Sequence, residues 1–301
     1  MTTQSISTPR APSRLRLNKA RYARRQFVNQ LMLVLCGVAA FLAVIPLVWI
    51  VVYVTREGSR FLSLDFFTNE PTPVGIPGGG VINAIVGSGM VVGIACLIAI
   101  PIGIIAAFYS SENPNTPLGI AVRFGTDVLS GVPSIVMGMF AYAVIVLPQR
   151  HFSALSGGIA LAIIMAPIIL RTTEEMLKLV PRNLREGSLA LGASEWKTTV
   201  QVMLPAAING VVTGVMLGVA RVAGEAAPMI FTAFGNPTLS TDLDQPVATL
   251  PHLIYVYSIA PYKEWHDKAW TTAFVLIVLV LGLNIAARLF TWWRLKKMGW
   301  H

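Results

Sequence analysis

The sequence predicts an all-α integral membrane protein with six transmembrane helices. Hydrophobic residues make up 54% of the 301 residues and charged residues only 12%, about half the charged fraction of an ordinary soluble domain. The apolar residues gather into runs that reach the roughly 20 residues a bilayer requires. Basic residues cluster before the first run and after the last one, which favours two cytoplasmic termini.

The first two spans are predicted at 31–54 and 81–109. The segment before them, 1–29, is polar and basic. The segment 56–80 contains PTPVGIPGGG, which is too rich in proline and glycine to be helical. Pro101 is expected to kink the second span, because proline removes a backbone donor and crowds the preceding turn.

The third and fourth spans carry charges near their ends. The third opens at Arg123 and Asp127, whose spacing suits an i,i+4 ion pair, and it ends near Leu147. The fourth runs from Ser153 to about Arg171, which places Arg171 at the inner boundary. Arg171 is therefore either a positive-inside anchor or the inner mouth of a pathway, and the residues alone leave both open.

The segment 174–205 is predicted to form short amphipathic helices on the cytoplasmic side. Its apolar residues recur with a helical period that is interrupted near Pro181. Gly192 suits a left-handed helix stop, and Ser194 is a plausible N-cap for a second helix. We expect two short helices that meet at a glycine elbow.

The fifth span begins after Pro205 and has one face of small residues. Gly210, Gly214 and Gly218 recur every four residues, a pattern that lets membrane helices approach closely. The segment 236–270 follows as a long outside loop, with a central apolar helix too short to cross the membrane. The sixth span is predicted at 271–290, and a basic tail follows it.

Arg221 and Glu225 place charge within the fifth span. They are one helical turn apart, so their side chains can meet. A central arginine costs about 2.5–3.5 kcal/mol on insertion scales, so such a charge usually faces the protein interior or water. The pair is either a structural lock between helices or an oxyanion site. In the second case the planar fork of Arg221 binds the anion, and Glu225 occupies the fork when the anion is absent.

Other function classes find little support in the residues. The net charge of +9 arises largely at the two ends of the chain, which fits membrane topology better than nucleic-acid binding. The two cysteines and four histidines show no metal-ligand or catalytic spacing, so we expect no metal site, no catalytic residues and no enzyme activity. A phosphate loop of the GxxxxGK[ST] type is absent from the sequence, so any ATP hydrolysis would belong to a partner.

The cytoplasmic segment resembles the EAA loop of ABC importer permeases. The matching positions are Glu186, Gly187, Ser188, Gly192, Val202, Leu204 and Pro205, with Gly187 and Ser188 in place of the two alanines of the motif. The resemblance implies that this segment is a coupling helix, which docks in a groove on an ATP-hydrolysing subunit.

Longer matches extend from about residue 78 to residue 288. The stretches GGGVINAIVGSG, GVPSIVMG, RTTEEMLKLVP, ARVAGEAAPMIFTAFGNP, QPVATLPHLIY and EWHDKAW resemble the PstA family, the permease subunits of phosphate ABC importers. The resemblance implies a type I importer fold in a bacterial inner membrane, and it places pathway arginines at Arg171 and Arg221, with Glu225 beside the second. It also implies a heterodimer with a PstC-like permease, two PstB-like subunits that carry ATP and Mg, and a PstS-like phosphate-binding protein. The chain needs no cofactor of its own.

On this interpretation the chain has four parts. These are a basic tail at 1–29, a first helix with its outside loop at 30–77, a permease core at 78–290 that contains the coupling loop 174–205, and a basic tail at 291–301. Two alternatives stay open: a permease for another oxyanion such as sulfate or molybdate, and an ATP-independent anion channel or secondary transporter.

Overall fold

The computed structural model describes residues 19–76 and 78–297, and the regular structure within them is helical. A single isolated bridge, between Phe234 and Val247, interrupts this pattern in the described chain. The all-α fold class is therefore confirmed. The predicted basic tails lie partly outside the described residues, at 1–18 and 298–301, whereas residues 19–29 are helical.

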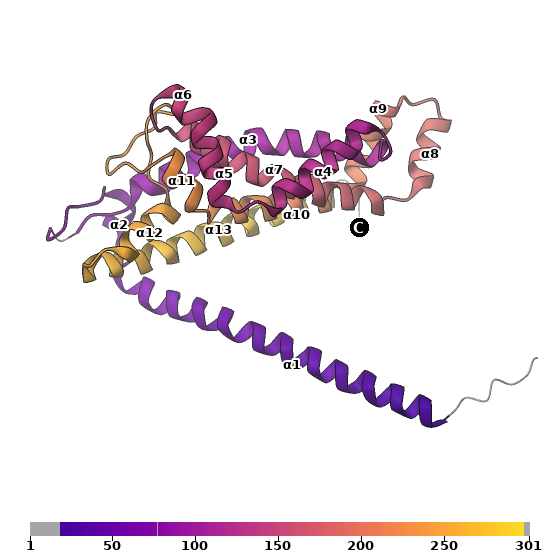
Figure 1. Cartoon of the computed structure of the whole chain (residues 1–301), viewed down its shortest axis with the longest axis horizontal. Coiled ribbons are helices and arrows are strands. Elements are labelled where there is room, and N and C mark those ends of the chain that lie inside the picture. The colour runs from indigo at the N-terminus through magenta and orange to yellow at the C-terminus, as the bar shows by residue number, and fades with distance from the viewer. Residues whose placement is uncertain (1–18, 77, 298–301) are drawn as a thin grey trace, which may run out of the picture. The chain divides into compact units, whose positions relative to one another are not determined.

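The helices follow one another along the chain as Figure 1 labels them. They are α1 (Lys19–Gly58), η1 (Ser59–Phe61), α2 (Leu64–Thr68), α3 (Ile82–Glu112), α4 (Pro117–Gly131), α5 (Ser134–Ala141), the π-helical turn η2 (Tyr142–Val146), α6 (Leu147–Gln149), α7 (Ala154–Leu179), α8 (Arg182–Ala190), α9 (Glu195–Thr198), the π-helical turn η3 (Thr199–Met203), α10 (Leu204–Ala223), α11 (Ala227–Thr232), α12 (Leu250–Ile259) and α13 (Lys263–Lys297).

The chain forms two compact units, 1–53 and 54–301. The described part of the first unit is α1 as far as Tyr53, which contains the predicted first span. The second unit contains the end of α1 and all the other helices.

Five helical segments of the described chain are long and apolar enough to cross a membrane. They are 21–61, 82–112, 154–179, 195–223 and 263–289. A sixth span results if the bent pair formed by 117–131 and 134–149 counts as one. Six spans agree with the sequence-based prediction, and the third is the one whose form differs.

The third span is broken rather than straight. Its two arms, α4 and α5–α6, meet at an angle of 108°. Between them Val132 is extended, with φ −79° and ψ 132°. The cause is Pro133, because the ring of a proline disfavours the helical conformation of the residue before it. The prediction of one span from Arg123 to Leu147 was wrong on this point, and the helix also begins earlier, at Pro117 with Thr116 as its N-cap.

Other helices are longer than the apolar runs suggested. α1 begins at Lys19, twelve residues before the predicted first span. α7 continues eight residues past Arg171 and ends at Leu179, before the extended residue Val180 that precedes a proline. Helical structure is unbroken from Glu195 to Ala223, so the fifth span does not begin at Pro205 but is continuous with the short helix α9 of the segment 174–205. α13 starts at Lys263, eight residues before the predicted sixth span.

α7 lies at the centre of the second unit, with α3 on one side and α10 on the other (Figure 1). Small residues allow this packing: a Cβ on Gly158 would overlap the side chain of Ile94 on α3, and a Cβ on Gly103 would lie 2.9 Å from Ile169. The buried core at this contact includes Val91, Ala95 and Ala99 of α3 with Leu161, Met165 and Ile169 of α7. The core therefore fixes α7 and α10, which carry the candidate site.

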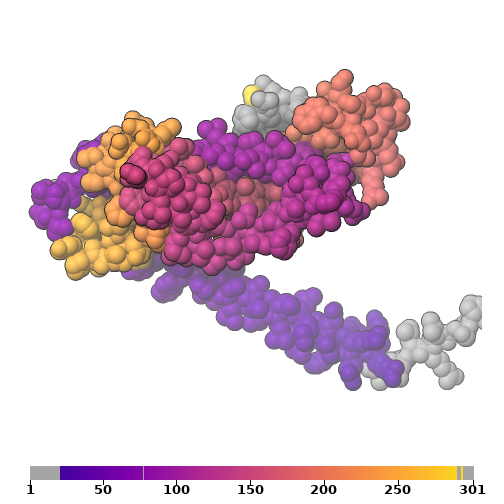
Figure 2. Space-filling model, turned by 45° about the horizontal axis from the view of Figure 1, so that its top comes forward, coloured from indigo at the N-terminus to yellow at the C-terminus, as the bar shows by residue number. Residues whose placement is uncertain are grey.

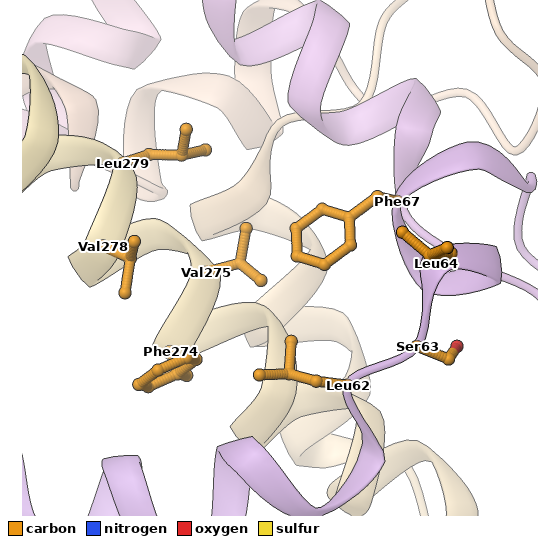
Figure 3. Close-up of a pocket in the computed structure, with 8 residues that line it drawn as sticks. All are labelled: Leu62, Ser63, Leu64, Phe67, Phe274, Val275, Val278 and Leu279. Carbon is orange, nitrogen blue, oxygen red and sulfur yellow. The ribbon is translucent and has the colours of Figure 1, made fainter.

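The long loop before α13 contains the expected short helix, α12. An apolar pocket lies nearby, between α13 and the segment that joins η1 to α2. Figure 3 shows the Phe67 ring and Val275 facing each other across it. The pocket is lined by Leu62, Ser63, Leu64, Phe67, Phe274, Val275, Val278 and Leu279. No lining residue is cationic, so this pocket is unsuited to an anion.

Candidate functional site

The three glycines of α10 face α7. A Cβ on Gly210 would overlap the side chain of Met176, and a Cβ on Gly214 would overlap that of Thr172. A Cβ on Gly218 would lie 3.1 Å from Met165. The small-residue face therefore allows a close approach of two antiparallel helices and sets their register.

This register places Arg221 near the middle of α7. Gly210 opposite Met176 and Gly214 opposite Thr172 put Arg221 level with Met165. At 1.5 Å per residue, that level is about 17 Å from the Ala154 end of α7 and about 21 Å from its other end. The same arithmetic separates Arg221 from the level of Arg171 by about 9 Å along the helix axis.

Arg221 lies in the last turn of α10, where the helix dipole favours a positive charge. Its side chain is 60% exposed, and its Nε lies 3.9 Å from Oε1 of Glu225, which is 18% exposed. That distance is too long for a hydrogen bond. Glu225 follows the helix, where α10 has ended at Ala223 and the chain turns toward α11. Arg221 and Glu225 are thus brought together, but the carboxylate does not occupy the guanidinium fork.

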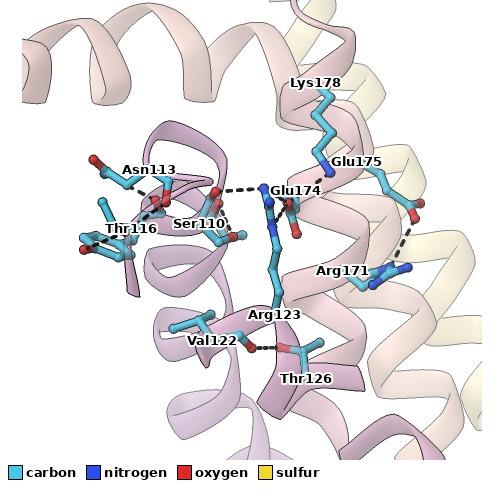
Figure 4. Close-up of polar contacts among 12 residues, drawn as sticks. Ser110, Asn113, Thr116, Val122, Arg123, Thr126, Arg171, Glu174, Glu175 and Lys178 are labelled. Atoms are coloured by element: carbon cyan, nitrogen blue, oxygen red, sulfur yellow. Dashed lines mark hydrogen bonds and ion pairs between the residues drawn. The ribbon is translucent and has the colours of Figure 1, made fainter. Parts of the chain in front are cut away.

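Arg171 is held more firmly. Its Nη1 donates a hydrogen bond of 2.6 Å to Oδ1 of Asp127 on α4, and its Nε lies 3.5 Å from Oε1 of Glu175. Figure 4 shows the second contact on α7. The Arg171 side chain is 55% exposed and that of Asp127 is 61% exposed. The formal charges of the three residues sum to one negative charge, so this arginine is not an uncommitted cation in the structure.

A second ionic cluster lies one turn away and is centred on a buried carboxylate. Arg123 of α4 donates from Nε to Glu174 Oε1 at 2.8 Å, and Lys178 Nζ lies 3.0 Å from the same oxygen (Figure 4). Arg123 Nη2 also donates to the backbone carbonyl of Ser110 at the end of α3. The Glu174 side chain is only 3% exposed. The cluster therefore joins α3, α4 and α7 through one desolvated carboxylate.

The local pair expected between Arg123 and Asp127 is not formed. Each residue instead pairs with α7, Arg123 with Glu174 and Asp127 with Arg171. The signal in the sequence was the order of charges, because a cation precedes an anion on each of the two helices. Since the helices are antiparallel, each cation then lies opposite the anion of the other helix. Such an order permits cross-helix pairs as readily as i,i+4 pairs, and burial of Glu174 favours the former.

The segment 174–205 forms the predicted elbow. Gly192 has φ +84°, in the left-handed region that favours glycine, and Ser194 caps α9 by accepting a hydrogen bond from the backbone N–H of Lys197. The hydroxyl groups of Ser188 and Thr198 are 2.9 Å apart, which joins α8 to the helix after the elbow. Two short helices are thus held against each other at Gly192.

The outer face of the elbow is open. Figure 2 shows the segment 182–203 as a projection at one end of the unit. Leu184, Leu191 and Trp196 are large exposed apolar residues on it. Glu186 is exposed, and a Cβ on Gly187 would meet no atom within 4 Å. Such a surface, apolar with polar neighbours, is typical of a contact site for another protein.

Arg185 connects the elbow to the core, a role that the sequence did not reveal. Its guanidinium pairs with Glu112 at the end of α3 and lies 3.8 Å from Glu195 of α9. The spacing of these residues in the sequence, more than 70 positions for the first pair, carries no signal of contact. The pair limits how far α8 can move independently of α3.

Comparisons with known proteins agree on one family. Residues 99–294 match the model of the binding-protein-dependent transport system inner membrane component. The phosphate transport system permease protein PstA of Haemophilus influenzae is 41% identical over 271 residues, which cover 90% of this chain and 96% of that protein. The PstA protein of Yersinia pestis is 40% identical, with coverage of 90% and 92%. A probable PstA of Methanocaldococcus jannaschii is 33% identical, with coverage of 88% and 94%.

Solved structures show the same fold at lower sequence identity. An inward-facing structure of the MetNI methionine ABC transporter has a TM-score of 0.55 at 19% identity, and the match covers 70% of this chain and 92% of that one. A second crystal form of that transporter has a TM-score of 0.54 at 20% identity. At this identity the likeness concerns the fold alone.

Proposed function

Because the chain belongs to the binding-protein-dependent transport inner membrane components, and within them to the PstA permeases, we propose that it is the transmembrane permease subunit of an ATP-driven importer of inorganic phosphate. It forms one half of a translocation pathway in the membrane. The family is one of transporter permeases, so the work of ATP hydrolysis, with its Mg, falls to a partner subunit.

The observation that carries the proposal is the position of Arg221. It projects from the end of α10 at about half the depth of α7, with 60% of its side chain exposed. A charge at that depth is stable only beside water or another protein surface. The planar guanidinium matches the geometry of a phosphate oxygen pair, and its loose contact with Glu225 leaves donors free to bind one.

Arg171 extends the pathway by about 9 Å toward the elbow. Arg171 is more strongly paired with carboxylates than Arg221 is, so it should bind phosphate more weakly. This suits a later position in the transport of the anion. Two single arginines in series favour transport over storage, because conduction requires sites that bind well enough to accept an ion and weakly enough to release it.

The elbow at Gly192 is the proposed contact for the ATPase. Its exposed apolar residues support this role, as does the unbroken helix that runs from Glu195 to Arg221. The complete transporter then contains a second, PstC-like permease, two PstB-like ATPases and a PstS-like phosphate-binding protein. Loaded binding protein docks outside, ATP closes the ATPases, and the elbows carry that closure to the two permeases.

Arg221→Ala tests the pathway role in the complete transporter reconstituted in lipid vesicles. We expect the variant to assemble normally and to lose phosphate uptake, because the oxyanion loses its donor. Arg60→Ala is the matched control, since Arg60 is also exposed and also pairs with a glutamate close to it in the sequence, Glu57. Normal uptake by Arg221→Ala would contradict the proposal.

The same vesicles test the choice of anion. Sulfate and molybdate share the tetrahedral geometry of phosphate, and a guanidinium does not select among them. We expect unlabelled phosphate to suppress uptake of labelled phosphate and equal sulfate or molybdate to leave it unchanged. Suppression by sulfate or molybdate at equal concentration would assign the subunit to another oxyanion. Uptake that continued without any ATPase subunit would instead indicate a channel or secondary transporter.

A further inference from the structure

Two ion pairs of opposite orientation connect α4 to α7. On α4 the cation Arg123 comes one turn before the anion Asp127, and on α7 the cation Arg171 comes one turn before the anion Glu174. Since the helices run in opposite directions, Arg123 meets Glu174 and Asp127 meets Arg171. The two contacts are one helical turn apart on the same pair of helices.

The contacts differ in how easily they open. Glu174 is buried and receives both Arg123 and Lys178, so separating this cluster would strand a desolvated charge. Asp127 and Arg171 are both more than half exposed, and water can replace either partner at little cost. The Arg123 cluster is therefore a fixed point, whereas the Asp127 contact is a releasable one.

α4 itself is packed loosely enough to move. Gly119 and Thr126 are its buried residues, whereas Leu118, Phe124 and Val128 are exposed. Its far end is the extended residue Val132, where the broken span turns through 108°. An element with few buried contacts lies at the low-stability end of a structure. α4 can thus pivot about Arg123 while its Asp127 end leaves α7.

Asp127 occupies the guanidinium donor that an oxyanion would use. Carboxylate and phosphate oxygens are equivalent acceptors for an arginine fork, and the negative sum of charge at Arg171 opposes a second anion. We propose, resting on the function proposed above, that Asp127 is an internal competitor for Arg171 that arriving phosphate displaces. The displacement frees the Asp127 end of α4, so the anion's arrival at Arg171 and the movement of α4 are one event.

Asp127→Asn tests the competition, because it keeps the size of the side chain and removes its charge. Binding of radiolabelled inorganic phosphate is measured by equilibrium dialysis on the complete transporter in lipid nanodiscs, without binding protein or ATP. An exposed pair contributes about 0.2–1 kcal/mol, so we expect the dissociation constant to fall by about 1.4- to 5-fold. The gain should vanish in an Arg171→Gln background, because the two residues act through one contact.

Glu175→Gln is the matched control for net charge. Glu175 also faces Arg171, but at 3.5 Å and from the same helix, so it does not link α4 to α7. We expect a smaller gain in phosphate affinity from this change than from Asp127→Asn. An equal gain from both variants, or no gain from Asp127→Asn, would overturn the role of Asp127.

Spin labels give a readout that simple charge removal would not move. In a variant without Cys36 and Cys96, labels at Val128 and Leu179 report the Asp127 end of α4, and labels at Phe124 and Leu179 report the position beside the pivot at Arg123. We expect inorganic phosphate, or Asp127→Asn alone, to change the first distance distribution and leave the second unaltered. A first distribution that neither treatment changes would refute the pivot.

Failure of this inference and failure of the proposed function are separable. If the unaltered transporter takes up phosphate and Arg221→Ala does not, the function stands whatever Asp127→Asn shows. If the unaltered transporter takes up no phosphate, the function fails first. The proposed role of Asp127 is then refuted together with the function, because it requires phosphate to reach Arg171.

Discussion

Gly214→Ala should loosen the contact between α10 and α7 and destabilise the protein. The new Cβ would overlap the hydroxyl oxygen of Thr172 and lie 2.7 Å from its Cβ. Rotation of the Thr172 side chain would break the hydrogen bond of 2.7 Å that its hydroxyl donates to the carbonyl of Ile168, and it would not move the Thr172 Cβ, which is attached to the helix backbone. The methyl group therefore meets an immobile neighbour.

The magnitude follows from two opposing effects. Replacing glycine by alanine inside a helix stabilises it by about 0.5–1 kcal/mol. Forcing an extra methyl group into a filled contact costs about 1–3 kcal/mol. The difference between the two is a net loss of about 0–2.5 kcal/mol in the free energy of unfolding, and the approach of 2.7 Å between the two Cβ atoms favours the upper half of that range.

Thermal unfolding of the purified chain in one detergent, followed by tryptophan fluorescence, measures this loss. Gly89→Ala on α3 is the matched control, because a Cβ there meets nothing within 4 Å. It should raise the Tm slightly, whereas Gly214→Ala lowers it. Adding Thr172→Ala to Gly214→Ala should recover part of the loss, since the overlapping hydroxyl is gone. Equal Tm values for the two glycine variants would refute the packing argument.

Two further predictions concern the elbow and the loops. Gly192→Ala places a Cβ at φ +84°, which costs about 1–2 kcal/mol of local strain, and it should raise the ATP hydrolysed per phosphate transported. Gly75→Ala is the matched control, because it places a Cβ at φ +83° in the loop between α2 and α3, away from the elbow, and it should leave that ratio unchanged. The hydrogen bond from His151 to Asp244, with a smaller effect of the Gln149 carbonyl, raises the pKa of His151 above its usual value. Its contribution to stability is therefore complete below the unfolded pKa of about 6.5 and is lost as pH rises through the folded value. In Asp244→Asn, the NMR titration of His151 should move to lower pH; an unmoved titration would exclude the Asp244 contact.

Much of the fold could be predicted from the strongly apolar runs and from the proline and glycine residues that end or bend helices. The glycine spacing at Gly210, Gly214 and Gly218 indicated a packing face because a face without side chains has few other uses in a membrane helix. The elbow at Gly192 was likewise predictable, since a left-handed residue between two amphipathic pieces has a clear local signature.

The broken third span escaped prediction for a physical reason. The residues around Val132 and Pro133 are as apolar as the rest of the run, so hydropathy shows no gap. The proline allows either a kinked helix or a full turn, and tertiary packing decides between them. The ends of α7 and α10 were misplaced similarly, because helical structure continues into polar residues after the apolar run has ended.

Charge partners were the least predictable part of the candidate site. The spacing of Arg123 and Asp127 suits a local pair, yet each residue binds α7 instead. Sequence spacing gives the reach of a side chain along its own helix and says nothing about the helix beside it. Arg221 and Glu225 were paired correctly, but their 3.9 Å separation depends on where α10 ends.

The helical stretch from Glu195 to Ala223 is unbroken, so the short helix after the elbow and the fifth span form a single lever. From Glu195 to Arg221 it measures about 39 Å. A tilt of about 5° about Glu195 shifts Arg221 by roughly 3 Å, which is about the length of one hydrogen bond. If the elbow contacts an ATPase and Arg221 binds the anion, as proposed above, a small closure at the Glu195 end is enough to make or break the contact with the anion.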